Sequence, residues 1–147
     1  MTDTSSPGTV LDQQPTRCVI VVDRDLPLGR LANAVAVIAL TVGQRHPGLV
    51  GAPLVDGAGF AHPGLIPIGV AMLAASRDEL PAIRDRALAT GCDVVDFPAE
   101  GQQTKDYQAF RDTVAALDPE AISYTGVALV GQKKEISRIV GKLDLLN

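Results

Sequence analysis

Apolar residues along the chain gather in short runs rich in Val, Leu and Ile, separated by polar turns and by longer stretches of helical spacing. Short β-branched runs bounded by turns are typical of buried strands, and apolar residues recurring three and four positions apart indicate helices. The pattern predicts strands at 17–22, 65–75, 93–97 and 124–130, and helices at 30–42, 78–91, 104–117 and 133–142.

Helix starts can be read from residues that accept hydrogen bonds from free N–H groups. Ser76 with Glu79 matches a capping box, but a cap there places Pro81 at the fifth helical position, where its missing N–H removes a bond. A cap at Asp78 places Pro81 at the third position, where that N–H would be free anyway, and we prefer it. Thr104 is expected to cap the third helix.

The order strand–helix, repeated four times, predicts an α/β fold. We expect a three-layer α/β/α sandwich with a mostly parallel sheet of roughly four strands and helices on both faces. Residues 17–147 are predicted to form this single domain. Residues 1–16 are rich in small and polar residues without a signal-peptide pattern, and are expected to be a flexible tail.

Charge and cysteine content limit the classes of function. The formal net charge is −4 and the basic residues are scattered, so nucleic acid is not expected as the principal partner. Folding could still gather Arg17, Arg24, Arg30 and Arg45 into a patch. Hydrophobic residues make up 46% of the chain, yet no stretch is long enough to span a membrane.

The two cysteines do not form a metal-binding motif. Without a CxxC or Cys/His cluster we expect no metal and no cofactor. Two buried, reduced thiols are expected, which suits a cytoplasmic protein; a reactive thiol is the alternative.

Polar side chains follow the predicted strands, where ligands gather in open α/β sheets. Asp25, Arg30 and Asn33 follow the first strand, Glu100 and Thr104 the third, and Lys133 the fourth. Thr125 opens the fourth strand, so it would join this edge only if that strand ran antiparallel. Three of these residues also have a purely structural interpretation. Asp25 would only end the strand, a buried Asn33 would brace a neighbouring loop, and Thr104 would cap a helix.

The long connection between the first two strands contains a second candidate pair. Asp56 and His62 lie in the segment DGAGFAH, and a carboxylate with an imidazole can perform acid–base chemistry. Asp-Gly is also an ordinary turn dipeptide, and an exposed loop histidine is common. The GxG at Gly57 and Gly59 is too short to indicate a dinucleotide site.

The segment RCVIVVDRDLPLGRLANAVAVIA resembles the opening of type 2 peptidyl-tRNA hydrolases, and Glu100 with Thr104, Thr125 before GVALVG and the closing VGKLDLL are similar to later motifs of that family. The resemblance covers about Arg17 to Asn147 and implies the same fold. Where those hydrolases carry lysines, this chain has Pro27, Arg30 and Ala32, so the resemblance does not carry over their phosphate-binding cations.

A closer resemblance is to the domain-of-unknown-function 2000 family. Its motifs correspond here to five segments, which are Asp25-Leu26-Pro27 with Gly29, Ala32-Asn33, Asp56 to His62, Ile66-Pro67-Ile68, and Tyr124 to Lys134.

Three functional hypotheses follow. The first is a domain that binds a small molecule or peptide in the cleft at the strand ends, without classical peptidyl-tRNA hydrolysis. The second is a hydrolase of an ester or amide, in which Glu100 or Asp25 assists water and Arg30 stabilises the developing oxyanion. The third is a homodimeric interaction module built on the apolar first helix.

Overall fold

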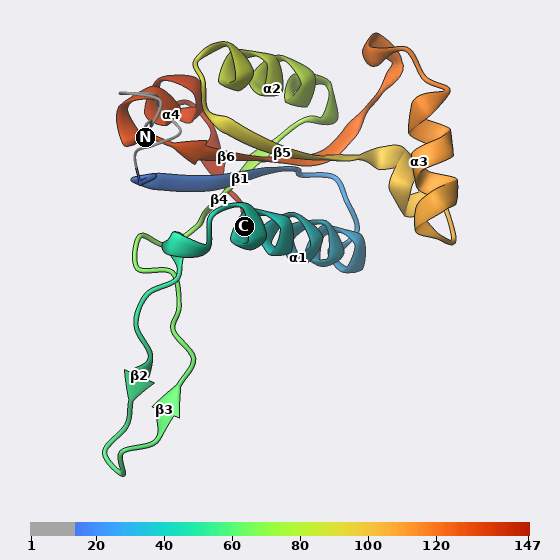
Figure 1. Cartoon of the computed structure of the whole chain (residues 1–147). Helices are drawn as coiled ribbons and strands as arrows, with labels where there is room; N and C mark the ends of the chain where they lie inside the picture. Colours follow the sequence, from blue (N-terminus) through green and yellow to red (C-terminus); the bar gives the residue numbers. More distant parts are fainter. Residues whose placement is uncertain (1–13) are drawn as a thin grey trace, which may run out of the picture.

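The computed structural model describes residues 14–147 of the chain (Figure 1); most of the predicted tail lies outside this range. Its helices and strands are β1 (Arg17–Asp23), α1 (Leu28–Arg45), β2 (Leu54–Val55), β3 (Ala61–His62), β4 (Ala71–Ala75), α2 (Leu80–Ala89), β5 (Asp93–Pro98), α3 (Tyr107–Ala115), β6 (Tyr124–Gly131), α4 (Lys133–Val140) and β7 (Asp144–Leu145). Short 3₁₀ turns are η2 (Pro47–Leu49), η3 (Arg77–Glu79), η4 (Ala99–Gln103) and η5 (Pro119–Ala121).

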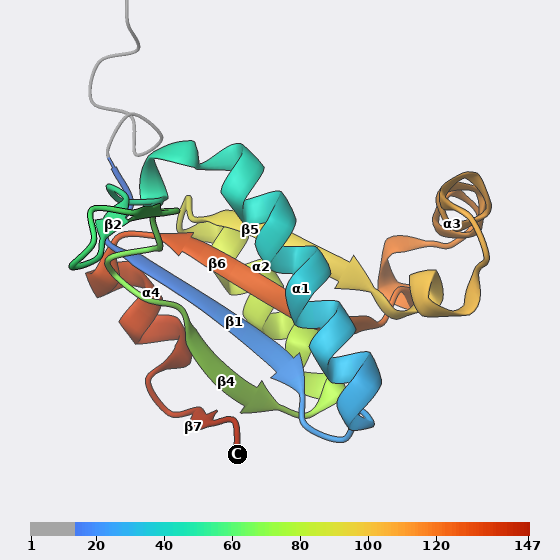
Figure 2. The same cartoon turned by 90° about the horizontal axis from the view of Figure 1, so that it is seen from below.

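The main sheet has five strands in the order β5-β6-β1-β4-β7. Strands β1 and β4 are parallel, whereas β6 is antiparallel to both of its neighbours and β7 is antiparallel to β4. The prediction of a mostly parallel, four-stranded sheet is therefore wrong, although the α/β class holds. A helix between two strands makes them parallel only when it crosses back over the sheet. Helix α3 instead lies beyond the end of β5 (Figure 2), so β6 re-enters from the same edge.

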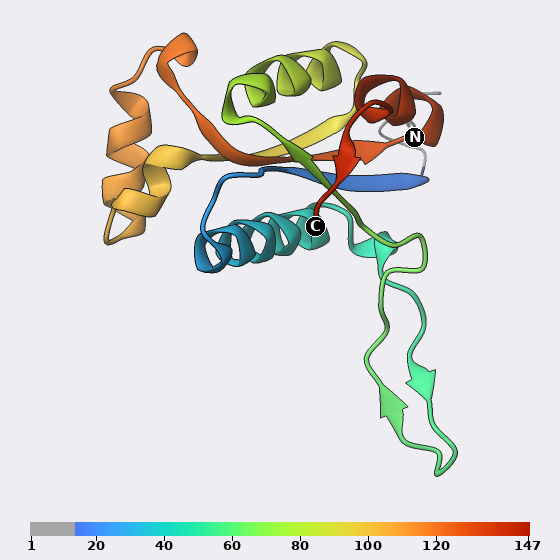
Figure 3. The ribbon, with the colours of Figure 1, turned by 180° about the vertical axis from the view of Figure 1, so that it is seen from behind.

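Helices cover both faces of the sheet, with α1 on one side and α2 and α4 on the other (Figures 1 and 3). The alternation of side chains along β1 supplies both cores. Val19 and Val21 pack in the cluster with α2 and α4, while Ile20 and Val22 pack in the cluster with α1. All four are at most 1% exposed, and each such burial contributes about 1.5–3 kcal/mol.

Helix α1 buries only one stripe of its surface. Ala34, Ile38 and Val42, at successive four-residue intervals, face the sheet, as a one-sided helix requires. The outer face, including Leu40 at 79% exposure, is not covered by any described residue. Within the described chain α1 is therefore covered on one side only, and Asn33 is exposed rather than buried.

Two predicted helix starts change for local reasons. Ser76 does form a capping box with Glu79, but around η3, so that α2 begins only at Leu80. The Asp78 cap is therefore wrong. Asp106, and not Thr104, caps α3 by accepting from the backbone N–H of Ala109.

The long connection projects from the body as an arm, defined here as residues 50–68 (Figures 1 and 3). The antiparallel pair β2 and β3 forms its outer part, joining Leu54 to His62 and Val55 to Ala61. At its root the backbone N–H of Gly51 donates to the carbonyl of Leu65 at 2.8 Å. The strand predicted from residue 65 starts only at Ala71, because residues 65–68 belong to the returning side of the arm and residues 69–70 connect it to the strand.

Candidate functional site

Strand direction decides which residues meet at one edge of the sheet. Because β6 runs antiparallel, its first residues lie beside the last residues of β1 and β5: Gly126 pairs with Val22 on one side and with Phe97 on the other. Asp23 at the end of β1 pairs with Ala75 at the end of β4. Thr125 therefore joins the edge where β1, β4 and β5 end, which we call the carboxyl edge.

Asp23 and Thr125 are the buried polar side chains of the described part of the chain, and both lie at the carboxyl edge. Asp23 is held by the backbone N–H of Asp25 at 3.0 Å and by Nε of Arg77 at 3.0 Å. The Thr125 hydroxyl donates to the carbonyl of Phe97 at 3.2 Å. Both residues are thus paired, and they brace the edge rather than offering free groups to a ligand.

Glu100 differs from these two residues. It lies in η4, directly after β5, and its Oε1 atom is buried without a hydrogen-bond partner among the described residues. A buried acceptor left unpaired costs about 1–3 kcal/mol. Such a group is usually explained by a water, an ion or a ligand that completes its bonding.

The η4 turn is fixed against two helices. Gln102 donates from its side-chain amide to the carbonyl of Arg30 at 3.3 Å, which ties η4 to the first turn of α1. Gly101 lies against the ring of Phe110 so closely that an added Cβ would come within 2.4 Å of it. Only glycine allows α3 to pack on η4 at this distance, so the turn that carries Glu100 is locked between α1 and α3.

Charged and aromatic side chains of three elements meet beside this turn. Nε of Arg84 on α2 donates to Oδ2 of Asp96 at 2.6 Å, and its guanidinium lies 5.4 Å from the ring centre of Tyr124. Burial raises the pKa of the Tyr124 phenol; Arg84 lowers it, and the charges of Asp96, Asp85 and Glu100 add to the increase. Tyr124 therefore stays protonated at neutral pH.

A groove runs along α3 and reaches Gly101 of the η4 turn. Two hollows of about 430 and 360 Å³ share the residues Asp96, Pro98, Tyr107 and Phe110, and so form one continuous groove between β5, α3 and α1. Its other lining residues include Gly101, Val37 and Arg111. This size and a mostly apolar and aromatic lining with few polar groups are typical of small-molecule sites.

The other residues predicted for the strand ends do not line this groove. Asp25, Arg30 and Asn33 are exposed, in the β1–α1 loop and on the first turns of α1. The Thr104 hydroxyl donates to the carbonyl of Gly101 at 3.0 Å. Thr104 therefore stabilises the η4 turn, and Glu100 is the predicted residue with a free acceptor.

Three predicted residues lie elsewhere. Asp56 and His62 are on the arm, where Oδ2 and Nε2 are 2.9 Å apart. Lys133 lies at the opposite end of the sheet, because β6 runs antiparallel and ends there; its backbone N–H donates to the hydroxyl of Thr16. The predicted position of Lys133 at the ligand edge is wrong for the same reason that the prediction for the sheet is.

Sequence reasoning missed Arg84, Asp96 and Tyr124 as neighbours of Glu100. One signal was present: Asp96 interrupts the otherwise apolar run from Val94 to Phe97. A charged side chain inside a buried strand needs a partner. Its partner, Arg84, comes from a helix and could not be assigned from the pattern alone.

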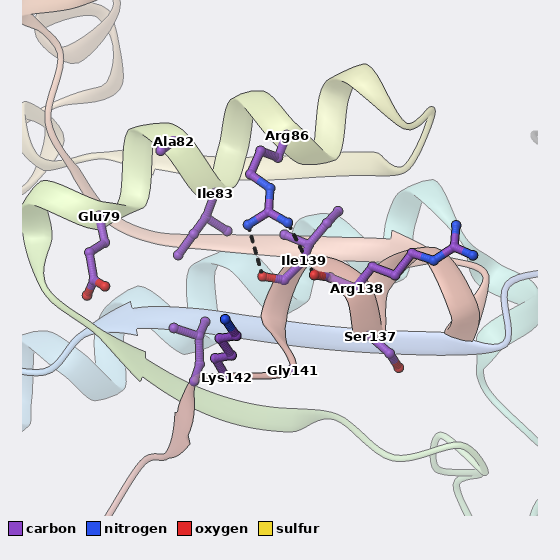
Figure 4. A pocket seen from close by; sticks show the side chains of 10 residues that line it. Glu79, Ala82, Ile83, Arg86, Ser137, Arg138, Ile139, Gly141 and Lys142 are labelled. Carbon is purple, nitrogen blue, oxygen red and sulfur yellow. Dashed lines mark hydrogen bonds between the residues drawn. The ribbon is translucent and has the colours of Figure 1, made fainter.

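A larger hollow of about 550 Å³ lies between α2 and α4 (Figure 4). Arg86 crosses it and donates to the carbonyls of Arg138 and Ile139 at 3.2 and 3.5 Å. These are carbonyls near the end of α4, which an arginine stabilises both by hydrogen bonding and through the helix dipole. Arg86 therefore holds α4 against α2.

Metal and thiol chemistry find no support in residues 14–147. No group of three or more His, Cys, Asp or Glu side chains there is arranged to hold a metal ion. Cys18 and Cys92 are free and buried. Burial raises the pKa of the Cys18 thiol, which makes it a poor nucleophile at neutral pH. Over the same residues, no helix has both the length and the apolar character needed to cross a membrane.

Comparison with known proteins places the chain in a family without assigning an activity. No curated protein matches it. A solved structure, a protein of unknown function from Agrobacterium tumefaciens strain C58, is similar with a TM-score of 0.80 and 20% identity, over 90% of this chain and 98% of that one; this likeness concerns the fold. The family model described as "Protein of unknown function (DUF2000)" matches residues 16–147. The chain therefore belongs to the DUF2000 family.

Proposed function

We propose that this domain binds a small molecule or a short peptide in the groove along α3, through a hydrogen-bond donor that pairs with Glu100. The observation that carries the proposal is the buried, unpaired Oε1 of Glu100, in the turn whose next residue, Gly101, lines the groove. An amino, amide or hydroxyl group of a ligand would complete the bonding of this oxygen. The apolar part of the ligand would lie against Phe110, Tyr107 and Val37.

The rigid surroundings of Glu100 support binding rather than a mobile surface carboxylate. Both neighbours of its turn are fixed, by the Gln102 bond to α1 and by the contact of Gly101 with Phe110. A preorganised site loses little conformational freedom when a ligand binds. The free, buried cysteines suit the reducing cytoplasm, which we include in the proposal.

The test uses Glu100→Ala, which removes the acceptor, with Glu120→Ala as a matched control, since Glu120 is an exposed carboxylate of η5. A panel of primary amines, amides and dipeptides is screened by thermal shift and by NMR. Compounds that raise the Tm of the wild type and of Glu120→Ala, but not of Glu100→Ala, support the proposal. Equal binding to both variants contradicts a role for Glu100.

A hydrolase is the second candidate, favoured by one contact. The bond from Gln102 to the carbonyl of Arg30 holds the η4 turn and the start of α1 together, so the residues proposed as water-activating carboxylate and as anion-stabilising cation lie on adjoining segments. The relation to type 2 peptidyl-tRNA hydrolases implied by the sequence motifs belongs to this candidate.

Hydrolysis of diacetyl-lysyl-tRNA by the purified protein tests this second candidate, with Glu100→Ala and Thr104→Ala as variants. Turnover that is at least about tenfold slower in both variants supports a hydrolase. Such a loss corresponds to a barrier about 1.4 kcal/mol higher. Turnover by the wild type that neither variant reduces removes Glu100 from the chemistry. Absence of turnover leaves the binding proposal, which the ligand screen decides separately.

A further inference from the structure

The arm and the outer face of α1 lie on the same side of the sheet (Figures 1 and 3), and we consider them together as one candidate surface. On the arm, Val55, Phe60 and Leu65 are 67%, 64% and 66% exposed; on α1, Leu40 is 79% exposed. Single exposed apolar residues are ordinary, but several large ones on neighbouring elements indicate an interaction surface.

Charge is nearly absent from this surface. Residues 31–44 of α1 contain no Asp, Glu, Lys or Arg, and the arm contains only Asp56. That carboxylate is already paired with His62 and with the backbone N–H groups of Ala58 and Phe60. The centres of protein interfaces are depleted of charged residues in the same way.

The arm needs a partner for its own stability. A two-stranded hairpin alone is marginally stable in water, and β2 with β3 has only two residue pairs in its ladder. The outer part of the arm gains little from packing on the rest of the described chain, since every residue from 52 to 63 is exposed. A body that packs against the arm would supply the missing apolar contacts.

The corner between the arm and α1 is hollow and apolar. A pocket of about 240 Å³ lies there, lined by residues of β1, α1, the root of the arm and the start of β4, among them Ile20, Val42, Leu49 and Ile66. It contains no charged side chain, so an inserted apolar side chain would lose no hydrogen bond and would gain contacts on all sides.

We infer that this surface binds a second copy of the same chain, the arm of each copy lying on the outer face of α1 of the other. In a two-fold dimer one contact is made twice, so a single arrangement covers both arms and both helices. The arm has sixteen exposed residues and α1 has eight between residues 32 and 44. Together they fall within the roughly 20–30 residues per partner of a stable interface.

The test is the oligomeric state of the full chain, measured by sedimentation equilibrium. The wild type is expected to be a dimer. Leu40→Glu on α1 and Phe60→Glu on the arm are each expected to weaken dimerisation at least about thirtyfold. Leu88→Glu is the matched control, because Leu88 is 49% exposed on α2, outside this surface, and it should remain dimeric.

Three results would overturn the inference. A monomeric wild type would show that the surface does not bind a second copy. A dimer that survives both glutamate variants would place the interface elsewhere. A dimer broken by Leu40→Glu but not by Phe60→Glu would mean that the helices pair without the arms. Circular dichroism of each variant confirms folding, which we expect because both side chains are mostly exposed.

Discussion

The helices on the two faces of the sheet differ in what they present outward. Helix α2 buries Leu80, Ile83 and Ala87 and carries Arg84, Asp85 and Arg86 on or near its outer surface. Helix α1 buries Ala34, Ile38 and Val42 but presents Ala, Val and Leu outward as well. The charged outer face of α2 is typical of a helix exposed to solvent, and the apolar outer face of α1 is typical of a helix covered on two sides. The residues on the inner face of each helix are apolar because they pack on the sheet. The residues on its outer face indicate whether water or another apolar surface covers that face.

The two faces are also attached to the sheet by different polar contacts. Arg45 and His46 at the end of α1 both bind Asp93 at the start of β5, at 2.7 and 2.6 Å for their closest atoms. On the other face, Arg84 and Arg86 of α2 bind Asp96 and the carbonyls near the end of α4. Each face thus combines an apolar stripe with an arginine that fixes its helix.

The largest expected effect comes from the inward stripe of α1. Ile38→Ala removes a side chain that is 1% exposed and leaves a cavity, so the free energy of unfolding should fall by about 2–5 kcal/mol. Urea denaturation at fixed protein concentration measures it. Leu88→Ala on the exposed face of α2 serves as the control and should change stability by less than about 0.5 kcal/mol. A loss below about 1 kcal/mol for Ile38→Ala would mean that α1 is not firmly packed on the sheet.

A smaller effect is expected where α1 is tied to β5. Asp93→Asn should lower the free energy of unfolding at neutral pH by about 1–3 kcal/mol, because Arg45 and His46 lose a charged acceptor. Urea denaturation at pH 7 measures this loss. Asp118→Asn, an exposed carboxylate far along the chain, is the control and should leave stability nearly unchanged.

The pH dependence of stability, compared between the wild type and Asp93→Asn, tests the same contact. Hydrogen bonds from Arg45, and then from His46, hold the pKa of Asp93 below its ordinary value. A carboxyl group with a lowered folded pKa stabilises the fold fully above its unfolded pKa, near about 4, and loses that contribution as pH falls through the folded value. The advantage of the wild type over Asp93→Asn should therefore begin to shrink as pH falls below about 4 and should be lost below the folded pKa of Asp93. An advantage that does not change as pH falls from neutral to well below about 4 would contradict the lowered pKa.

The smallest effect concerns the tip of the arm. His62 is the main cause of the lowered pKa of Asp56, with the backbone N–H groups of Phe60 and Ala58 adding to it. His62→Ala should raise the pKa of Asp56 toward its ordinary value, as followed by NMR titration. Amide exchange at Phe60 should become faster as the tip loosens. An unchanged Asp56 pKa would show that the pair does not form in solution.

Element types near strong local signals could be predicted from the sequence. β1 follows from the run of β-branched residues at 17–22, and β5 from the run at 93–97, because apolar strand patterns need no partner to be recognised. The position of Glu100 after a strand could be predicted in the same way. That its Oε1 would be buried and unpaired could not, because this depends on where α3 and η4 pack.

Predictions failed where the outcome depended on a competing residue nearby or on how distant segments pack. Thr104 has the chemistry of a helix cap, but Asp106 takes that role two residues later. Asn33 looked buried because its neighbours are apolar, whereas it lies on a face that no described residue covers. Lys133 followed the right strand, but that strand runs in the opposite direction.

The sequence by itself determined the α/β class, the approximate positions of the helices and main strands, the family and the scarcity of charged residues in residues 31–44 and in the arm. These properties are local, since they depend on residue spacing and composition. Only the tertiary structure decided the direction of β6, the bracing of Asp23 and Thr125 at one edge, and the projection of the arm. The reason is that strand direction depends on where a connecting segment packs, and α3 packs beyond the end of β5 instead of across the sheet.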